Sequence, residues 1–222
     1  FHKYAAQDGF KVDADSMANR ALANIAFSYW CQSLAAQEDA AGLARLLEDR
    51  YGAADNLTDR RVVLSLVARL PELDEQTRQR ILEDFYTQWQ SQALVIDLWF
   101  NLQAQSPRSD VPALRALTSH PGFDRKNPNR VRSVYGAFGM LNLRRLHALD
   151  GSGYEFVASA VAEMDTINPQ IAARLATPLT RWKKFDPTRQ RLMRDALNSL
   201  LSGATQELSK DLFEIVSKSL DQ

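Results

Sequence analysis

The sequence predicts an all-α fold, an irregular superhelical solenoid of antiparallel helix pairs. Apolar residues recur at steps of three and four through most of the 222 residues, which is the spacing of one helix face. Glycine (9 residues) and proline (8 residues) are scarce, and this disfavours turn-rich sandwiches and barrels. Hydrophobic residues at 45% and charged residues at 24% are ordinary globular values, so a chain of this length buries a substantial core.

Five apolar stripes mark helices in order along the chain. The first helix is expected over about residues 16–36. The second helix has Thr58 as its expected N-cap and is expected to stop at Pro71. Asp74 is the expected cap of the third helix, and Gly203 is expected to end the fourth. The stripes are Leu22, Ile25, Ala26, Tyr29 and Trp30; Val63, Leu66, Val67 and Leu70; Ile81, Leu82 and Phe85; Leu192, Met193, Ala196, Leu197, Leu200 and Leu201; and Leu212, Ile215, Val216 and Leu220.

Residues 93–100 have strand-like composition, but nothing nearby offers a partner strand, so a helix is predicted there. Three further helix starts share one chemistry, at Asn127-Pro128, Asn168-Pro169 and Asp186-Pro187. The side chain before proline caps the helix, and proline at the first helical position loses no hydrogen bond. The two Asn-Pro starts lie about 40 residues apart, near the length of a two-helix unit in an ARM- or HEAT-like solenoid. Ten to twelve helices in a single domain over 1–222 are expected.

Charge is balanced overall but uneven along the chain. The 27 basic and 27 acidic side chains cancel, whereas residues 124–194 hold 13 basic and 6 acidic ones, a net charge of +7. Such a basic zone attracts phosphates, carboxylates or an acidic partner. The alternative is a solvated helix face with no binding role.

The residue types that carry catalysis or bind metals form no recognisable motif. The single Cys31 excludes a disulfide framework and a cysteine-based zinc finger. His2, His120 and His147 lack the spacing of a zinc-binding helix; His120 is expected in a turn and His147 at a helix C-terminus. We therefore assign no catalytic residue and no metal ligand to this chain. No apolar run is long enough to cross a bilayer, no signal peptide pattern is present, and the absence of an initiator Met suggests a fragment of something larger.

Two helix starts in the basic zone suggest a binding role. Residues 127–132 place Arg132 in the first turns of one helix, and Gln170 and Arg174 share a face at the start of another. A helix N-terminus together with a Gln amide and an Arg guanidinium suits a peptide carboxylate or a backbone carbonyl. The alternative is a helix cap plus a surface salt bridge.

Several segments resemble bacterial aminopeptidase N, of the gluzincin, alanyl aminopeptidase family. The similarity spans nearly the whole chain, and the motifs occur in family order. It indicates the carboxy-terminal helical domain of that family, without its first helices. The segments are 54–60 (ADNLTDR), 95–100 (VIDLWF), 120–133 (HPGFDRKNPNRVRS), 147–154 (HALDGSGY) and 168–190.

The resemblance implies a parent enzyme that removes N-terminal amino acids from peptides with one zinc ion. The metal-binding His-Glu-x-x-His motif belongs to an upstream thermolysin-like catalytic domain and is absent here, so this chain is expected to bind no cofactor and to be inactive alone. The helical domain would close over the catalytic chamber of the same polypeptide and limit access to peptides. Arg132, Gln170 and Arg174 match family positions that face this chamber near the primed side of the substrate site.

The expected partners are therefore the catalytic domain and peptide substrates, in the cytoplasm, with no membrane and no nucleic acid. The alternative function is a free-standing helical-repeat scaffold that binds protein or nucleic acid through its basic face.

Overall fold

The computed structural model describes residues 9–202 and 208–221, and within these residues the secondary structure is helical, without strands. The all-α prediction is confirmed. Contacts between Cα atoms group the chain into two compact units, Phe1–Leu102 and Gln103–Gln222. The division falls near the end of one helix, and the expectation of a single domain stays a prediction.

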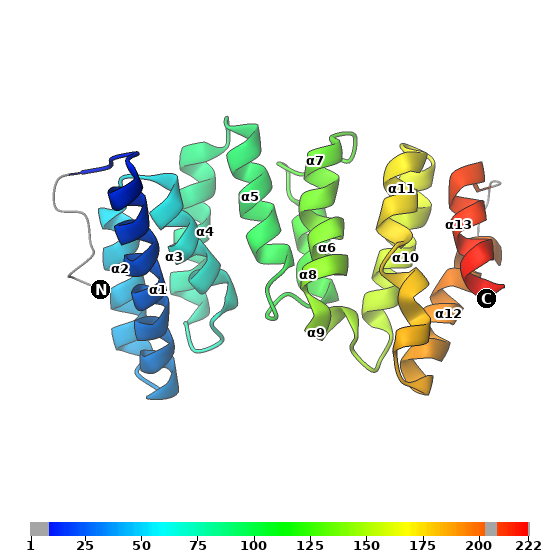
Figure 1. Ribbon diagram of the computed structural model, residues 1–222, viewed down its shortest axis with the longest axis horizontal. Helices are drawn as coiled ribbons and strands as arrows, with labels where there is room; N and C mark the ends of the chain where they lie inside the picture. Colours follow the sequence, from blue (N-terminus) through cyan, green and yellow to red (C-terminus); the bar gives the residue numbers. More distant parts are fainter. Residues whose placement is uncertain (1–8, 203–207, 222) are drawn as a thin grey trace. The chain divides into compact units, whose positions relative to one another are not determined.

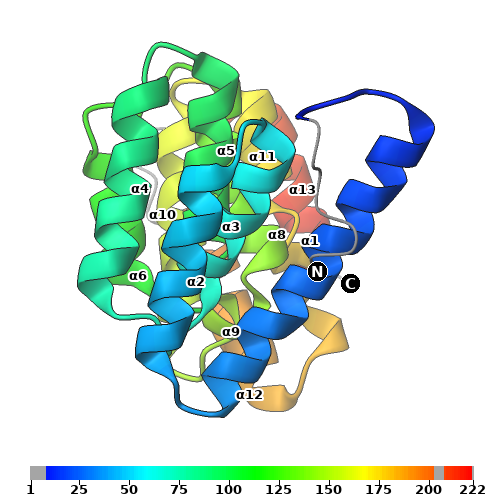
Figure 2. The same ribbon diagram turned by 90° about the vertical axis from the view of Figure 1, so that its left-hand side faces the viewer.

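In the first unit, consecutive helices pack side by side, with α1 against both α2 and α3, and α4 against α3 (Figure 1). Figure 2 shows α1 and α2 meeting at the link between them and diverging toward the start of α1. The core of this unit lies between these helices and includes Phe27, Leu47, Val67 and Phe85, all fully buried. Its helices are α1 (Ala14–Ala36), α2 (Ala40–Ala53), α3 (Leu57–Arg69), α4 (Glu75–Trp89) and α5 (Ala93–Ala104).

Local capping explains where these helices begin. Asp74 accepts a hydrogen bond from the Thr77 backbone N–H at 2.8 Å, as predicted. The cap of α3 is Asn56, which accepts from the Asp59 N–H at 2.9 Å, so the prediction of Thr58 as N-cap is wrong. Asn and Thr both suit a cap, and the helix takes the earlier residue because Asn56 has the extended backbone that a cap requires.

The first helix buries the face opposite to its predicted stripe. Ala23, Phe27 and Cys31 are buried against α2 and α3, whereas Ile25 is 55% exposed and Tyr29 is 70% exposed. Both faces of α1 are apolar, so periodicity finds the helix without deciding which face enters the core.

In the second unit, α10 packs against α11 and α12, and α13 packs against α11 and α12 (Figure 1). Tyr154, Val161 and Met164 of α10 are fully buried at its centre. The predicted end at Gly203 lies outside the described residues. The helices are α6 (Val111–Ser119), α7 (Pro128–Val131), the π-helical turn η1 (Arg132–Gly136), α8 (Ala137–Leu141), α9 (Leu143–Leu146), α10 (Ser152–Asp165), α11 (Pro169–Ala176), the 3-10 helix η2 (Leu179–Lys184), α12 (Pro187–Ser202) and α13 (Lys210–Leu220).

The three X-Pro helix starts form as predicted. Asn127 accepts from the backbone N–H groups of Asn129 and Arg130, and Asn168 accepts from that of Ile171 at 3.2 Å. Asp186 caps α12 in the same way, through Thr188 at 3.1 Å. The two Asn caps fix the start of α7, which Arg132 follows, and the start of α11, which carries Gln170 and Arg174.

Candidate functional site

Arg132 opens the π-helical turn that follows α7. The Ala137 N–H donates to the Arg132 carbonyl, the wider spacing typical of a π-helix. Such turns occur frequently at functional sites because they rotate side chains away from the regular helical positions. The flanking Val131 and Ser133 are buried, while Arg132 is exposed. Local backbone geometry therefore presents this guanidinium at the surface.

Gln170 and Arg174 lie one turn apart on α11. Both are exposed, and the opposite side of the helix buries Ile171, Ala172 and Leu175. Their shared face follows from the spacing of four residues. The two side chains thus lie on one helix and are both exposed, and their role in binding stays a prediction.

Two glycines show that η1–α8 runs beside α11. A Cβ added at Gly136 would lie 3.6 Å from the Arg132 Cβ and 4.0 Å from Leu175 Cδ2, and one at Gly139 would lie 3.1 Å from Pro178 Cγ. Residue pairs 136/175 and 139/178 share one offset, so the two segments run in the same direction. This register places Arg132 level with the turn of α11 between Gln170 and Arg174.

The three side chains are available for a ligand. Within the part of the chain that the structure describes, none of them makes a side-chain hydrogen bond or an ion pair with another residue. Two guanidinium groups and an amide on neighbouring helices thus face solvent without internal partners. This set can donate several hydrogen bonds to a carboxylate or a carbonyl oxygen.

Other cations of the basic zone are engaged in holding the fold. Arg130, two residues before Arg132, is buried and donates to the Gly122 carbonyl. Arg145 donates to the Pro107 carbonyl at 2.6 Å, and Arg189 to that of His147 at 2.9 Å. Arg125 pairs with Glu163 at 3.0 Å. The charge of this zone is therefore partly structural.

His147 forms a polar cluster that sequence reasoning did not find. The predicted role at a helix C-terminus is confirmed, since His147 ends α9. Its Nδ1 lies 2.8 Å from the Tyr154 hydroxyl, and its ring centroid is 4.3 Å from that of Phe185. Burial, followed by the nearby Arg189 charge, lowers the pKa of His147. Tyr154 lies seven residues away across a turn, and nothing in the sequence indicates that contact.

His120 and Cys31 are structural residues. His120 ends α6 and its Nδ1 accepts from the Gly122 N–H at 3.0 Å, which confirms the predicted turn. Burial raises the pKa of the Cys31 thiol to about 12, so this side chain packs as a small apolar group.

The described residues hold no group of three or more His, Cys, Asp or Glu side chains placed to bind a metal ion. The residues that the structure describes therefore do not fit a zinc ion. Among the same residues, no helix is both long enough and apolar enough to cross a membrane.

Comparisons with known proteins give consistent matches. A family model described as a domain of unknown function (DUF3458_C) with ARM repeats matches residues 1–221. Proteins named aminopeptidase N are similar over 95–96% of this chain: those of Haemophilus influenzae (37% identical, 23% of the relative covered), Caulobacter vibrioides (36%, 23%) and Escherichia coli (36%, 24%). The crystal structure of Legionella pneumophila aminopeptidase A in complex with aspartic acid matches 99% of this chain and 25% of its own, with a TM-score of 0.83 and 29% identity. The chain thus spans about a quarter of the length of these relatives.

Proposed function

Because the chain belongs to the DUF3458_C family of ARM-repeat domains, and its relatives confirm the resemblance to aminopeptidase N, we propose that it is a non-catalytic domain of a zinc-dependent aminopeptidase. In this role it closes over the catalytic domain of the same polypeptide, limits access to the active site and binds the primed side of peptide substrates. The zinc ion and the catalytic groups belong to that other domain. A cytoplasmic location agrees with the single, buried Cys31.

The observation that supports the binding role is that Arg132 lies level with the turn of α11 that carries Gln170 and Arg174. Two cations without internal partners, on neighbouring helices, attract the terminal carboxylate of a short peptide. The Gln170 amide can donate to a peptide carbonyl while its oxygen accepts from a peptide N–H. An aminopeptidase releases residues from the amino end of a peptide, so the carboxyl end lies on the primed side, where a cationic face is useful.

The test uses the longer polypeptide that carries this chain, with zinc bound. We expect Arg132→Ala and Arg174→Ala each to raise the KM for dipeptides and tripeptides by about 3- to 10-fold, the equivalent of roughly 1 kcal/mol for one exposed charged contact. The corresponding peptides with an amidated carboxyl end lack the negative charge, so their KM should change much less. Steady-state kinetics on matched acid and amide peptides measures this difference.

Arg191→Ala is the matched control, because Arg191 is an exposed cation of the same unit on α12, apart from the α7–η1 and α11 face. Arg191→Ala should leave the KM unchanged for the acid peptides and for the amide peptides. Equal effects on acid and amide peptides in the Arg132 and Arg174 variants would remove the carboxylate-binding role.

The alternative, a free-standing scaffold that binds through its basic face, has less support. Arg125, Arg130, Arg145 and Arg189 of the basic zone are engaged within the fold. Fewer cations then remain for phosphates, whereas nucleic-acid affinity grows with the number of phosphates neutralised.

A further inference from the structure

Exposed cations gather where η2 packs against α12 in the second unit. Arg181, Lys183 and Lys184 are three of the last four residues of η2, and Arg194 lies on α12. All four side chains are exposed, and η2 itself contains no acidic residue. The two elements pack against each other, so their cations belong to one region of the unit. These four residues are called the η2 cluster below.

The Trp182 indole holds two of these cations at one place. This side chain is only 9% exposed, and its Nε1 donates to the Ser219 carbonyl at 3.1 Å, which fixes the ring. Lys183 Nζ lies 5.4 Å from the ring centroid, and the guanidinium carbon of Arg194 lies 5.1 Å from it. The ring attracts both cations but carries no net charge, so two positive charges stay together without neutralisation. Such an arrangement favours a bound anion.

The acidic residues of the fold do not neutralise the cluster. Asp186, which follows η2, pairs with Arg189 at 2.7 Å. Asp195, next to Arg194 on α12, is exposed and forms an ion pair with none of the four cations. Within the part of the chain that the structure describes, no cluster side chain donates a hydrogen bond or forms an ion pair. The cluster therefore differs from the cations of the basic zone that hold the fold together.

We propose that the η2 cluster is a docking surface for an Asp- and Glu-rich segment of a separate protein. Carboxylates form charge-assisted hydrogen bonds with Arg and Lys, and clusters of cations are a recurring means of recognising acidic motifs. Arg181 and Lys184 are one turn of the 3-10 helix apart and share a side of η2, which extends the surface beyond Trp182. This binding is independent of the peptide carboxylate site proposed above.

Other polyanionic partners fit the cluster less well. Single-stranded nucleic acid binds where exposed aromatic rings stack with bases. Here Trp182 is nearly covered, and Phe185 packs against His147 with their ring centroids 4.3 Å apart. A helix that binds a membrane surface inserts large apolar side chains beside its cations, and in the described stretch 179–200 no large apolar side chain is exposed. The favoured ligand is therefore a flexible row of carboxylates.

The test uses the longer polypeptide that carries this chain, with zinc bound, and a fluorescent octapeptide of glutamate. Acetylation protects the probe from an aminopeptidase, and amidation removes the terminal carboxylate that Arg132 and Arg174 are proposed to bind. Fluorescence anisotropy measures the Kd, with the corresponding glutamine octapeptide as the neutral probe. We expect the glutamate probe to bind more tightly than the glutamine probe. The triple variant Lys183→Gln, Lys184→Gln, Arg194→Gln should raise the Kd of the glutamate probe at least about tenfold, because three exposed pairings are lost.

The matched control is the triple variant Arg45→Gln, Arg61→Gln, Arg69→Gln, which removes the same charge from exposed positions of the first unit. Its Kd should stay close to that of the parent polypeptide. If the cluster variant folds poorly, Arg181→Gln with Lys184→Gln replaces it, and the Kd should rise about threefold. Equal effects in the cluster and control variants, or no binding of the glutamate probe by the parent, would overturn the proposal. So would tighter binding of an oligothymidylate with eight phosphates or of phosphatidylserine vesicles, because the partner would then be a nucleic acid or a membrane.

Discussion

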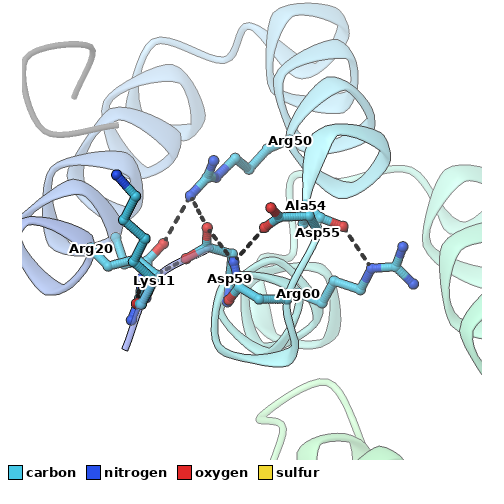
Figure 3. A network of polar contacts seen from close by, with 9 residues as sticks. Lys11, Arg20, Arg50, Ala54, Asp55, Asp59 and Arg60 are labelled. Atoms are coloured by element: carbon cyan, nitrogen blue, oxygen red, sulfur yellow. Dashed lines mark hydrogen bonds and ion pairs between the residues drawn. The ribbon is translucent and has the colours of Figure 1, made fainter. Parts of the chain in front are cut away.

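The Arg50 guanidinium of α2 and the Asp59 carboxylate of α3 form an ion pair of 2.8 Å, and both side chains are largely buried (Figure 3). Asn24 of α1 donates to the same carboxylate at 2.8 Å, and the Arg50 guanidinium lies 3.4 Å from the Asn24 carboxamide oxygen. Asn56, the cap of α3, also donates to Asp59 at 3.2 Å. One carboxylate therefore connects the first three helices.

Removal of this carboxylate should destabilise the protein strongly. We expect Asp59→Ala to lower the free energy of unfolding by about 3–5 kcal/mol, because a buried cation then loses the negative charge that faces it. Urea unfolding followed by circular dichroism measures the change. Glu83→Ala, at an exposed carboxylate of α4 outside this network, should stay within about 0.5 kcal/mol of the parent chain. Similar values for the two variants would show that the network contributes little.

Gly153 and Gly52 should respond to alanine in opposite directions. A Cβ at Gly153 would lie 2.5 Å from the Leu146 carbonyl oxygen and 2.7 Å from that of Arg145, and both are backbone atoms that cannot easily move. Gly153→Ala should therefore cost roughly 1–3 kcal/mol or more. Gly52 in α2 has nothing within 4 Å of its added Cβ, so Gly52→Ala should be neutral or stabilise by up to about 1 kcal/mol. Thermal unfolding of the two variants gives the sign of each change in stability. Destabilisation of equal size in both variants would contradict the steric argument.

The helices were predictable from the sequence because their signals are local. Caps such as Asp74 and Asn127 act on backbone N–H groups two or three residues away, so reading them needs no tertiary information. The cap of α3 was misplaced by two residues because Thr58 and Asn56 are both acceptable there. The helix predicted at 93–100 is confirmed, despite the strand-like composition of this segment.

What the sequence did not determine depends on contacts between distant residues. Arg130 and Arg132 are the same residue type two positions apart, so the sequence alone does not distinguish their roles. In the structure the buried Arg130 donates to the Gly122 carbonyl, whereas Arg132 is exposed. The register that brings Arg132 level with α11 rests on the contacts of Gly136 and Gly139, and it is at Gly139, where an added Cβ would lie 3.1 Å from Pro178 Cγ, that the missing side chain allows a close approach. Periodicity likewise could not decide which apolar face of α1 is buried.

Asn142 holds the loop between α5 and α6 through one amide group. Its Nδ2 is buried within 2.7–3.2 Å of the carbonyl oxygens of Ala104, Ser106 and Ser109. Asn142→Ala removes the amide donor that these carbonyl groups share, although the Ser106 carbonyl still accepts from the Ser109 N–H at 3.0 Å, and the loss should cost roughly 1–3 kcal/mol in the free energy of unfolding.

Asn142→Asp should be at least as damaging, because a carboxylate has no N–H to donate and would face the same oxygens. Chemical denaturation of both variants tests this, with exposed Asn198→Ala on α12 as the control. An Asp variant as stable as the parent chain would mean that the amide donors contribute nothing.

His147 should make stability depend on pH in the mildly acidic range. Burial, with the Arg189 charge in second place, lowers its pKa in the folded chain, and the same two causes, with Arg130 as the charge, lower that of His120. As the pH falls below about 6.5 the unfolded chain takes up a proton on each imidazole before the folded chain does, so stability decreases through that window and is unaffected above it. The polar groups around the His147 imidazole are the Tyr154 hydroxyl, the Arg189 guanidinium and the Asp186 carboxylate, which is paired with Arg189.

His147→Gln should therefore reduce the difference in unfolding free energy between pH 7.5 and pH 5.5, and the double variant with His120→Gln should reduce it further. The measurement is a urea titration at each pH on the parent chain and both variants. The sign is the decisive feature, because a histidine stabilised in its charged form would make the folded chain more stable as the pH falls. If His147→Gln makes the loss at pH 5.5 larger, the imidazole is held charged, and the assignment of a half-buried neutral histidine against Tyr154 is wrong.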